Sequence, residues 1–437
     1  MFKKKTLWLA LAGLIATNAA AAVDSDVLMQ EMRRLAERVE QLEAANKKLE
    51  AALNLSGNAS NSAMAARLDD IENEVMAIRK APKPFESLEG ISAGASLVLV
   101  AQGADGVDSE LTARADVEVE LPMGEIGEAE GKLFAHFRAG NGEGIDGAVG
   151  AWAPSNSMAF GQDSRMDLMQ AWYQLDVPVG GASGDLGRVE FTFGKIDPFG
   201  FFDGNNGADD ESEQFLNLAF IHNPLLDAGG DVAPGDDGAS PGVRLAYVSD
   251  INGGNNITAS LGFFGSGDGG NFSDSFDSGF VIGQLEYAGK TFGGLSGAYR
   301  LYAWTNGSTV DLSGGQDRHS GWGASIDQDV ASNITVFSRI GHSSQGAVNF
   351  EWAFTLGVQI GGTGWGREND RLGLAYGWLD SSDESGSPEA ERIVELYYAW
   401  QLNDQIALTP DIQWIRNRSG AAADDVTVWG LRAKASF

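Results

Sequence analysis

The sequence predicts an all-β transmembrane barrel of about sixteen antiparallel strands, preceded by an α-helical coiled-coil segment. Three observations support this fold class. The chain begins with a secretory signal, most of its length consists of runs in which apolar and polar residues alternate, and short connections between these runs alternate with long ones. Each part of the chain is taken below in order.

Residues 1–22 have the three parts of a signal peptide. Lys3, Lys4 and Lys5 form a basic start, an apolar run follows, and Ala20-Ala21-Ala22 supplies an A-x-A cleavage site. We expect cleavage after Ala22. No later run reaches the 18 or so apolar residues of a spanning helix, so the sequence predicts an exported protein without a helical anchor.

The composition excludes several functions. The chain has no cysteine, which removes disulfides and thiol catalysis. Its formal charge is −31, and loss of the three signal lysines gives −34, which argues against nucleic acid as a partner. The 58 glycines and 11 tryptophans suit many tight turns and aromatic girdles at a membrane interface.

Residues 23–84 are predicted to form a periplasmic coiled coil and linker. Over residues 26–55 the heptad positions a and d form a narrow apolar seam, with Asn46 as the polar exception. The a positions are Met32, Val39, Asn46 and Leu53, and the d positions are Leu28, Leu35, Leu42 and Leu49. The seam predicts self-association as a trimer or a dimer; the alternative is one amphipathic helix lying on the domain.

Residues 85–437 are predicted to form the barrel. Sixteen alternating runs begin near Gly90, Leu111, Gly131, Leu168, Val189, Gly242, Ile257, Phe280, Leu295, Trp322, Ile334, Phe350, Arg371, Arg392, Ile406 and Val426. In the last run Trp429, Leu431 and Phe437 share one face, and Arg432 and Lys434 share the other. In a membrane barrel the first face meets lipid and the second lines a wet lumen.

The lengths of the connections favour a membrane barrel over a soluble sandwich. Even-numbered connections such as 331–333 are short, whereas odd-numbered ones such as 197–241 and 306–321 are longer. An even strand number places both chain ends in the periplasm. Closure satisfies every backbone group in hydrocarbon, and a barrel this wide leaves an aqueous channel. The sequence therefore predicts passive solute passage through the outer membrane.

The polar faces of the strands supply the candidate pore lining. Both charge signs occur, so ion selectivity stays open. The residues are Arg114, Asp116, Glu118, Lys132, His136, Arg138, Glu190, Arg244, Glu286, Arg300, Arg339, Arg371, Glu395, Asp411, Arg432 and Lys434. Gln170, Trp172 and Gln174 also share one face, an arrangement that suits sugars; the alternative is a girdle tryptophan beside ordinary wall amides.

The long connection 197–241 carries ten acidic residues and no Lys or Arg. Its apolar centre predicts that it folds into the barrel mouth as a constriction. The acidic candidates are Asp197, Asp203, Asp209, Asp210, Glu211 and Glu213. The run from Asp209 to Glu213 is a candidate Ca²⁺ site or anion barrier; the alternative is a solvated acidic rim. The four histidines show no catalytic spacing, so no enzyme is predicted.

The C-terminal runs resemble those of carbohydrate-selective porins of the OprB type. The matching motifs are Tyr397-Tyr398, Pro410-Asp411 with Gln413, and Gly430-Leu431-Arg432 with Phe437. The resemblance covers roughly 168–437 and implies a sixteen-stranded channel permeable to sugars. Asn417-Arg418 stands where the family often has Asn-Pro, and the coiled coil is similar to the linker of porins that bind peptidoglycan. The alternative function is a general ion and small-solute porin whose coiled coil tethers the envelope.

Overall fold

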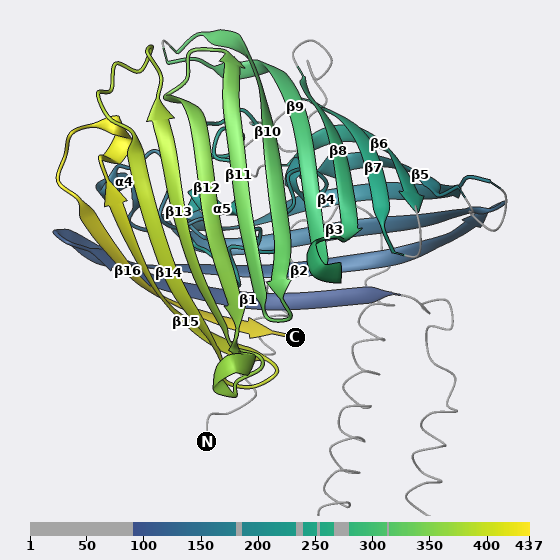
Figure 1. The fold of residues 1–437 in the computed structure, drawn as a ribbon, viewed down its shortest axis with the longest axis horizontal. Coiled ribbons are helices and arrows are strands. Elements are labelled where there is room, and N and C mark those ends of the chain that lie inside the picture. Colours follow the sequence, from purple (N-terminus) through teal and green to yellow (C-terminus); the bar gives the residue numbers. More distant parts are fainter. Residues whose placement is uncertain (1–90, 181–185, 233–238, 251–253, 266–278, 313) are drawn as a thin grey trace, which may run out of the picture. The chain divides into compact units, whose positions relative to one another are not determined.

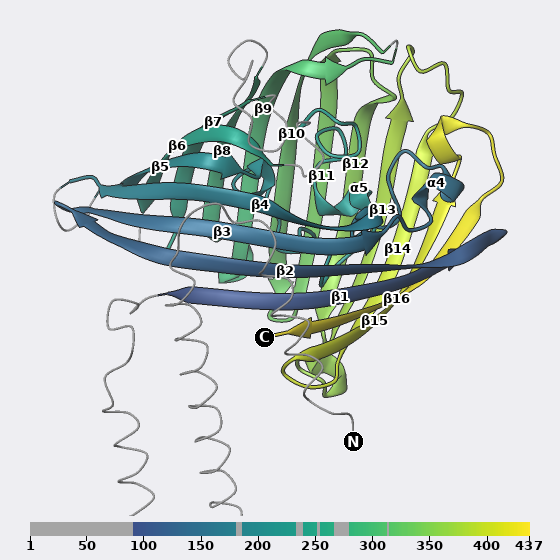
Figure 2. The same ribbon diagram turned by 180° about the vertical axis from the view of Figure 1, so that it is seen from behind.

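In a computed structural model, sixteen antiparallel strands form one closed barrel (Figures 1 and 2). The structure describes residues 91–180, 186–232, 239–250, 254–265, 279–312 and 314–437. The predicted signal peptide and coiled coil lie outside these residues. Each strand pairs with its neighbours in the sequence, and β1 pairs with β16. The sheet therefore has no free edge, as membrane insertion requires.

The strands are β1 (Ser92–Ala104), β2 (Val107–Ile126), β3 (Ala129–Gly142), β4 (Gly161–Pro178), β5 (Arg188–Ile196), β6 (Ser240–Asp250), β7 (Asn256–Phe264), β8 (Phe280–Lys290), β9 (Ser296–Val310), β10 (Gln316–Ala331), β11 (Ile334–Gln345), β12 (Phe350–Gly361), β13 (Arg371–Ser381), β14 (Glu391–Gln401), β15 (Ile406–Arg416) and β16 (Val426–Ser436). The short helices are α4 (Asp146–Val149), α5 (Leu218–Ile221), η2 (Pro198–Gly200), η4 (Phe292–Gly294), η5 (Gly362–Trp365) and η6 (Arg418–Gly420). No helix in the described ranges is long and apolar enough to span a membrane.

The last strand closes the barrel, as the sequence predicts. β16 pairs with β1 from Ser96↔Ser436 to Ala104↔Val428. The terminal Phe437 extends this ladder, because its N–H donates to the carbonyl of Ala95 at 2.8 Å. Its aromatic side chain is 76% exposed and faces outward. The C-terminal aromatic residue thus belongs to the lipid-facing surface.

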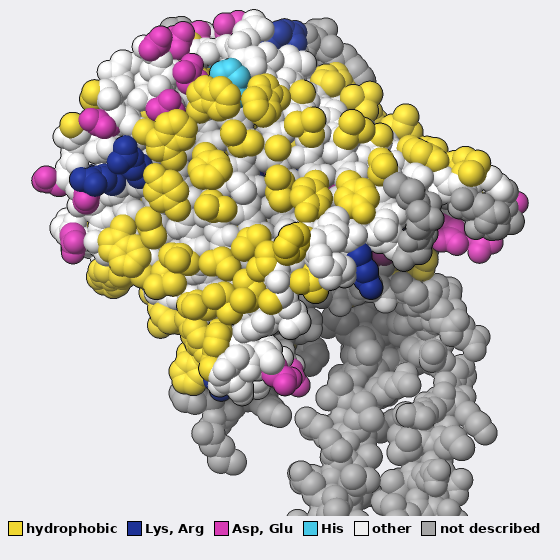
Figure 3. All heavy atoms as spheres, in the orientation of Figure 1, with side chains coloured by type: hydrophobic (Ala, Val, Ile, Leu, Met, Phe, Trp, Pro, Cys, Tyr) yellow, Lys and Arg dark blue, Asp and Glu magenta, His cyan; other side chains and the backbone are white. Residues whose placement is uncertain are grey.

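Large apolar side chains cover the outside of the barrel (Figure 3). In β16 Trp429 and Leu431 are half exposed, whereas the alternate residues Val428 and Arg432 are buried. The same alternation runs through most strands because successive side chains point to opposite faces. The predicted assignment of the apolar face to lipid and the polar face to the interior agrees with this burial.

The connections are only partly sorted by length between the two ends of the barrel. At the end where β1 begins, here called the turn end, the chain turns tightly at 127–128 and 332–333. At the opposite loop end lie the long connections 143–160 and 197–239. The prediction of a long connection over 306–321 is wrong, because β9 and β10 extend into this range and leave only residues 311–315 between them. Its polar, glycine-containing sequence concealed strand extensions beyond the apolar core of each run.

Candidate functional site

Residues 197–232, here called the inner loop, lie inside the ring of strands, where both ribbon views place α5. Its side chains Phe202, Phe215, Phe220 and Leu225 are almost completely buried. They join a cluster whose wall residues come mostly from β8 to β16. Phe215, for example, meets the ring of Tyr397 at a centroid distance of 4.9 Å. Apolar burial thus fixes the inner loop against one side of the barrel.

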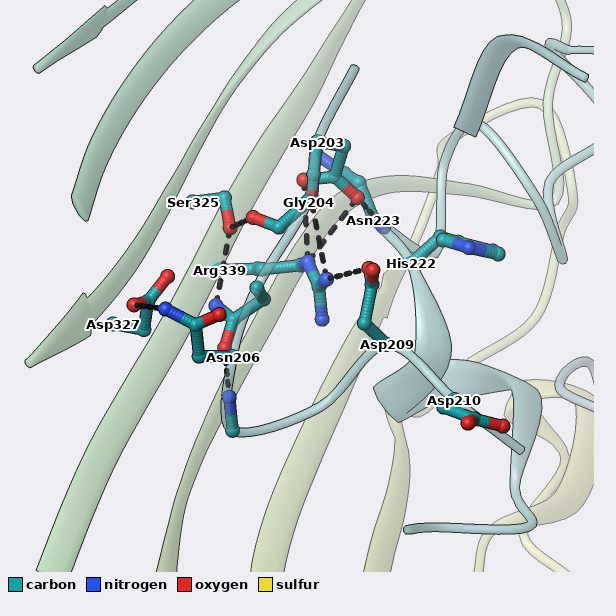
Figure 4. A network of polar contacts seen from close by, with 12 residues as sticks. Asp203, Gly204, Asn206, Asp209, Asp210, His222, Asn223, Ser325, Asp327 and Arg339 are labelled. Atoms are coloured by element: carbon teal, nitrogen blue, oxygen red, sulfur yellow. Dashed lines mark hydrogen bonds and ion pairs between the residues drawn. The ribbon is translucent and has the colours of Figure 1, made fainter. Parts of the chain in front are cut away.

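Arg339 of β11 anchors the start of the inner loop (Figure 4). Its side chain and that of Asp203 are completely buried, with Nε 3.1 Å from Asp203 Oδ2. Its Nη1 donates to the Phe220 carbonyl at 2.9 Å. Asp203 also accepts from the Tyr302 hydroxyl at 2.6 Å and from the Asn223 N–H at 2.5 Å. With its carboxylate bonded in this way, Asp203 adopts a left-handed backbone conformation with φ 60°.

Glu395 of β14 holds the middle of the inner loop. Its buried carboxylate accepts the backbone N–H groups of Leu216 at 2.6 Å and Asn217 at 2.9 Å. The Asn217 side chain then donates to Gln413 at 2.9 Å. A buried carboxyl group needs such donors because an unpartnered polar group is costly inside a protein. These bonds fix the backbone of the loop as well as its side chains.

A third anchor holds the end of the inner loop. Asp231 accepts from Trp304 Nε1 at 2.8 Å and is hydrogen-bonded to His319 Nδ1 at 2.7 Å. Asp231 and His319 are almost completely buried. The inner loop is therefore fastened at its start, middle and end to three separate places on the wall.

The acidic segment, residues 209–213, faces other parts of the wall. Glu211 forms an ion pair with Arg114 of β2 at 2.6 Å, and its carbonyl accepts from Arg432 Nη1 at 2.7 Å. Burial opposes ionisation of Glu211, but the charges of Arg114 and Arg138 lower its pKa to about 2. The carboxylate therefore stays ionised at neutral pH.

Asp209 has the opposite electrostatic balance. Its side chain is 39% exposed, and its carboxylate lies 3.4 Å from Arg339. Protein atoms still crowd this carboxylate, and the burial raises its pKa to about 7 against the opposing charges of His222 and Arg339. Burial would lower the pKa of His222, but its hydrogen bond to Asp227 raises it to about 9. Near neutral pH, Asp209 is the titrating group of this pair.

Four wall residues form what we call the Asp116 cluster: Arg114, Asp116, His136 and Arg138. The Asp116 carboxylate lies 3.0 Å from Arg114 Nε, 2.7 Å from His136 Nε2 and 2.6 Å from Arg138 Nε. A cavity of about 410 Å³ is lined by this cluster and by residues 209–212 of the inner loop, which meet at the Arg114–Glu211 ion pair. In this cavity, here called the first cavity, the charged wall and the acidic loop face each other.

Residues 130–437, well over half of the chain, match the carbohydrate-selective porin family OprB. The chain belongs to this family. Its fold is similar to the Pseudomonas putida OprB structure at high pH, with TM-score 0.67, 15% identity, and coverage of 84% of this chain and 96% of that one. The low-pH structure of the same porin gives TM-score 0.51, 14% identity, and coverage of 84% and 95%. No curated protein matches the chain.

Family membership and the barrel together establish the general function. The protein is an outer-membrane porin for passive diffusion of carbohydrates or other small hydrophilic solutes, and it is not an enzyme. Its path through the membrane is the interior of a closed barrel whose strands meet lipid on their apolar face.

Within this OprB-family barrel, Trp172 points inward and is only 8% exposed, so it is not a girdle residue. Its ring stacks on Phe134 at 4.9 Å and meets the edge of Phe201 at 5.5 Å. Its Nε1 donates to Gln170 Oε1 at 3.1 Å. Gln174 donates to Asp176 at 2.8 Å and accepts from Thr192 at 3.0 Å. The expected sugar-binding groups are thus largely engaged with the protein itself.

Most of the other predicted lining residues also point inward and are paired within the protein. Arg244 donates to Glu190 at 2.9 Å and lies over the Phe201 ring, while Arg300 Nη1 donates to Asp327 at 2.8 Å. Asp411 is buried and accepts from Gln413 at 3.1 Å. Seven of these other lining residues contact the inner loop, namely Arg114, Arg244, Arg339, Arg371, Glu395, Arg432 and Lys434.

The acidic candidates of the loop are not gathered into one site. The Asp197 carboxylate caps η2 by accepting the Phe199 N–H at 2.9 Å, and burial raises its pKa. Asp210 is exposed. Within the described ranges no group of three or more His, Asp or Glu side chains is placed to hold a metal ion. Calcium binding therefore stays a prediction.

The sequence analysis missed a second segment that folds inward, the connection 143–160. Glu391 of β14 accepts the N–H groups of Trp152 at 2.8 Å and Ala153 at 3.2 Å. The Ser155 carbonyl accepts from both Gln102 at 3.0 Å and Gln413 at 2.9 Å. The apolar residues Ile145, Val149, Trp152 and Met158 within this glycine-containing stretch were the signal that was available.

Proposed function

We propose that solutes cross the barrel beside β2 and β3, between the Asp116 cluster and the acidic segment. The first cavity carries this proposal, because its lining comes from both of these elements. The opposite side of the inner loop is closed by its apolar packing on strands β8 to β16. The polar side of the loop is the one left to face a solute.

Partly exposed charges on both sides of this path suit a neutral polyol. Arg138 keeps 19% of its side chain exposed and Glu211 keeps 18%. Such groups donate to and accept from hydroxyls, so a sugar can exchange its hydrogen bonds to water for bonds to the protein at little net cost. Because the charges are already paired, the wall binds a sugar weakly enough to release it.

The test is single-channel conductance of the refolded mature protein in a planar bilayer, titrated with simple sugars and maltodextrins. Saturable block by sugar, weakened by Arg138→Ala but not by the exposed control Arg416→Ala, is the expected result. Conductance that sugar does not affect would support the assignment as a porin but refute the proposed carbohydrate path. The absence of any conductance would show that the inner loop closes the barrel.

A general ion and small-solute channel is the second candidate. The first cavity is lined by the carboxylates of Asp116, Glu118, Asp209, Asp210 and Glu211 but only by the cations of Arg114, Arg138 and Lys434, besides His136. This acidic excess favours cations over anions. A reversal potential measured under a KCl gradient decides between cation preference and none.

We further propose that residues 23–84 form the periplasmic coiled coil and join copies of the chain as a trimer or dimer. The apolar a and d seam of residues 26–55 supports this proposal. Crosslinking the mature protein tests it, and a monomer alone would overturn it. Deleting residues 26–80 separates the two roles, because loss of envelope integrity with intact permeability would identify a tether.

Calcium binding at the acidic segment is proposed on the carboxylates of Asp209, Asp210, Glu211 and Glu213. Because Glu211 and Glu213 pair with Arg and Lys, a calcium ion must compete with those partners. Isothermal titration of the folded porin with CaCl₂ tests this, with Asp210→Asn as the variant. Equal heats with and without the substitution would exclude Asp210 as a ligand.

A further inference from the structure

The turn end of the barrel holds a second polar cavity beside the first. This second cavity, of about 270 Å³, lies between the tip of the inner loop and the wall formed by β13 to β16. Its lining includes Arg371, Gln401, Asp404 and Thr409. Like the first cavity, it reaches the ends of strands that in outer-membrane barrels face the periplasm.

Three residues line both cavities and so form the wall between them: Ser212, Lys434 and Ser436. The Lys434 ammonium donates to Ser212 Oγ at 2.8 Å and to Glu213 Oε1 at 2.7 Å. Glu213 Oε2 in turn accepts from Arg371 Nη1 at 3.3 Å. We call this chain of charges from β16 through the loop tip to β13 the Glu213 bridge.

We propose that the Glu213 bridge divides the periplasmic end of the channel into two parallel exits, one through each cavity. The proposal rests on the proposed path between the Asp116 cluster and the acidic segment. A solute that reaches the loop tip meets polar lining on both sides of Lys434, and neither cavity is lined by the apolar cluster of the loop. Glu213, which lines the second cavity, thereby sets the width of that exit and the largest solute that leaves through it.

The charges of the bridge explain why the tip stays between the exits. Glu213 neutralises one of the two cations that it contacts, so the bridge carries one net positive charge beside an otherwise acidic loop. Burial opposes ionisation of Glu213, but Lys434 and Arg371 lower its pKa, so the bridge is intact at neutral pH. Its side chain is 43% exposed and that of Arg371 is 47% exposed, so solutes can reach the bridge.

Cysteine labelling tests the two exits directly, because the natural chain has no cysteine. Ser96→Cys, on the inward face of β1, lies in the first cavity and Ala407→Cys in the second, and each is modified with a bulky thiol reagent added from the turn end. Parallel exits predict that each label alone removes part of the conductance, with the smaller loss at Ala407, and that the double label removes nearly all of it. Ser332→Cys, an exposed turn position, is the control for labelling that blocks nothing.

Three results would overturn the proposal. No loss of conductance on labelling Ala407 would show that the second cavity is a blind pocket. Complete loss from either single label would show one path in series. If neither label alters the conductance, the path lies elsewhere. A protein that never conducts refutes the proposed function instead, so the two failures can be told apart.

A matched pair of charge variants tests the role of Glu213. Glu213→Gln and Asp404→Asn each remove one negative charge from the lining of the second cavity, but only the first lies in the bridge. We expect Glu213→Gln to admit larger polyethylene glycols from the turn end and Asp404→Asn to leave the size limit unchanged. Equal effects of the two variants would reduce Glu213 to one lining charge among others and overturn its dividing role.

Discussion

Replacing Arg339 with methionine should free the start of the inner loop while leaving the barrel closed. The guanidinium and its partner Asp203 are completely buried. Removing one member of such a pair typically costs about 3–5 kcal/mol, because the other charge is left unpaired. The contact to Asp209 adds little, since that side chain is 39% exposed. The ladder bonds of β11 do not involve the side chain and remain.

This free energy converts into an observable. At about 1.4 kcal/mol per factor of ten, the docked position of the loop start loses roughly a hundredfold to a few thousandfold in population relative to the wild type. The middle and end of the loop keep their bonds to Glu395 and Asp231. We therefore expect Arg339→Met channels to show added current noise and larger open levels in planar bilayers, with sugar block weakened.

Two companion variants make the measurement decisive. Arg339→Met combined with Asp203→Asn should lie closer to the wild type than Arg339→Met alone, because the unpaired buried charge is then gone. Arg416→Met, in an exposed pair with Asp425 at 3.5 Å, should change nothing. Wild-type noise and open level in Arg339→Met, at unchanged heat resistance of the folded barrel, would refute the anchoring role.

Three other perturbations follow from the geometry. Raising the pH from 6 to 8 should increase cation preference, because Asp209, with a pKa of about 7, gains its charge while Glu211 and His222 keep theirs; reversal potentials check this, and Asp209→Asn should abolish the change. Trp172→Ala should lower the temperature at which the barrel unfolds, at a cost of about 3–5 kcal/mol for a buried aromatic side chain, and a variant as stable as the wild type would contradict its packing role. Leu431→Arg should cost up to about 2–4 kcal/mol on the lipid face and reduce the folded fraction in vesicles, whereas Leu431→Phe should not.

The sequence was sufficient for the strands because the information that defines them is local. Alternation and turn residues located all sixteen strands, and the predicted starts at Ile334 and Phe350 coincide with those of β11 and β12. Starts were late where a strand extends past its apolar core, as at Gly161 and Gln316. Extensions of this kind depend on pairing with a neighbour, which periodicity within a single run does not reveal.

The interior of the barrel was less predictable because its contacts join residues far apart in the chain. Glu395 was identified as a lumen-facing charge, but nothing local to β14 indicates that it holds the backbone of Leu216 and Asn217. Trp172 was correctly placed on the inner face, yet its partners Phe134 and Phe201 come from β3 and the inner loop. Polarity assigns a side chain to the lumen, and only the fold decides whether it meets solute or protein.

The anchors of the inner loop differ in how they should respond to salt. Those at Arg339, Glu395 and Asp231 are buried and poorly screened, whereas the bridge at Glu213 is 43% exposed. The Debye length falls from about 10 Å at 0.1 M to about 3 Å at 1 M salt, so exposed pairs weaken while buried ones persist. The loop tip should therefore loosen at high salt while the body of the loop stays docked. We expect the largest polyethylene glycol that enters from the turn end to increase in size between these two salt concentrations, and Glu213→Gln to remove this dependence. A size limit unaffected by salt in the wild type would mean that packing, and not charge, holds the tip.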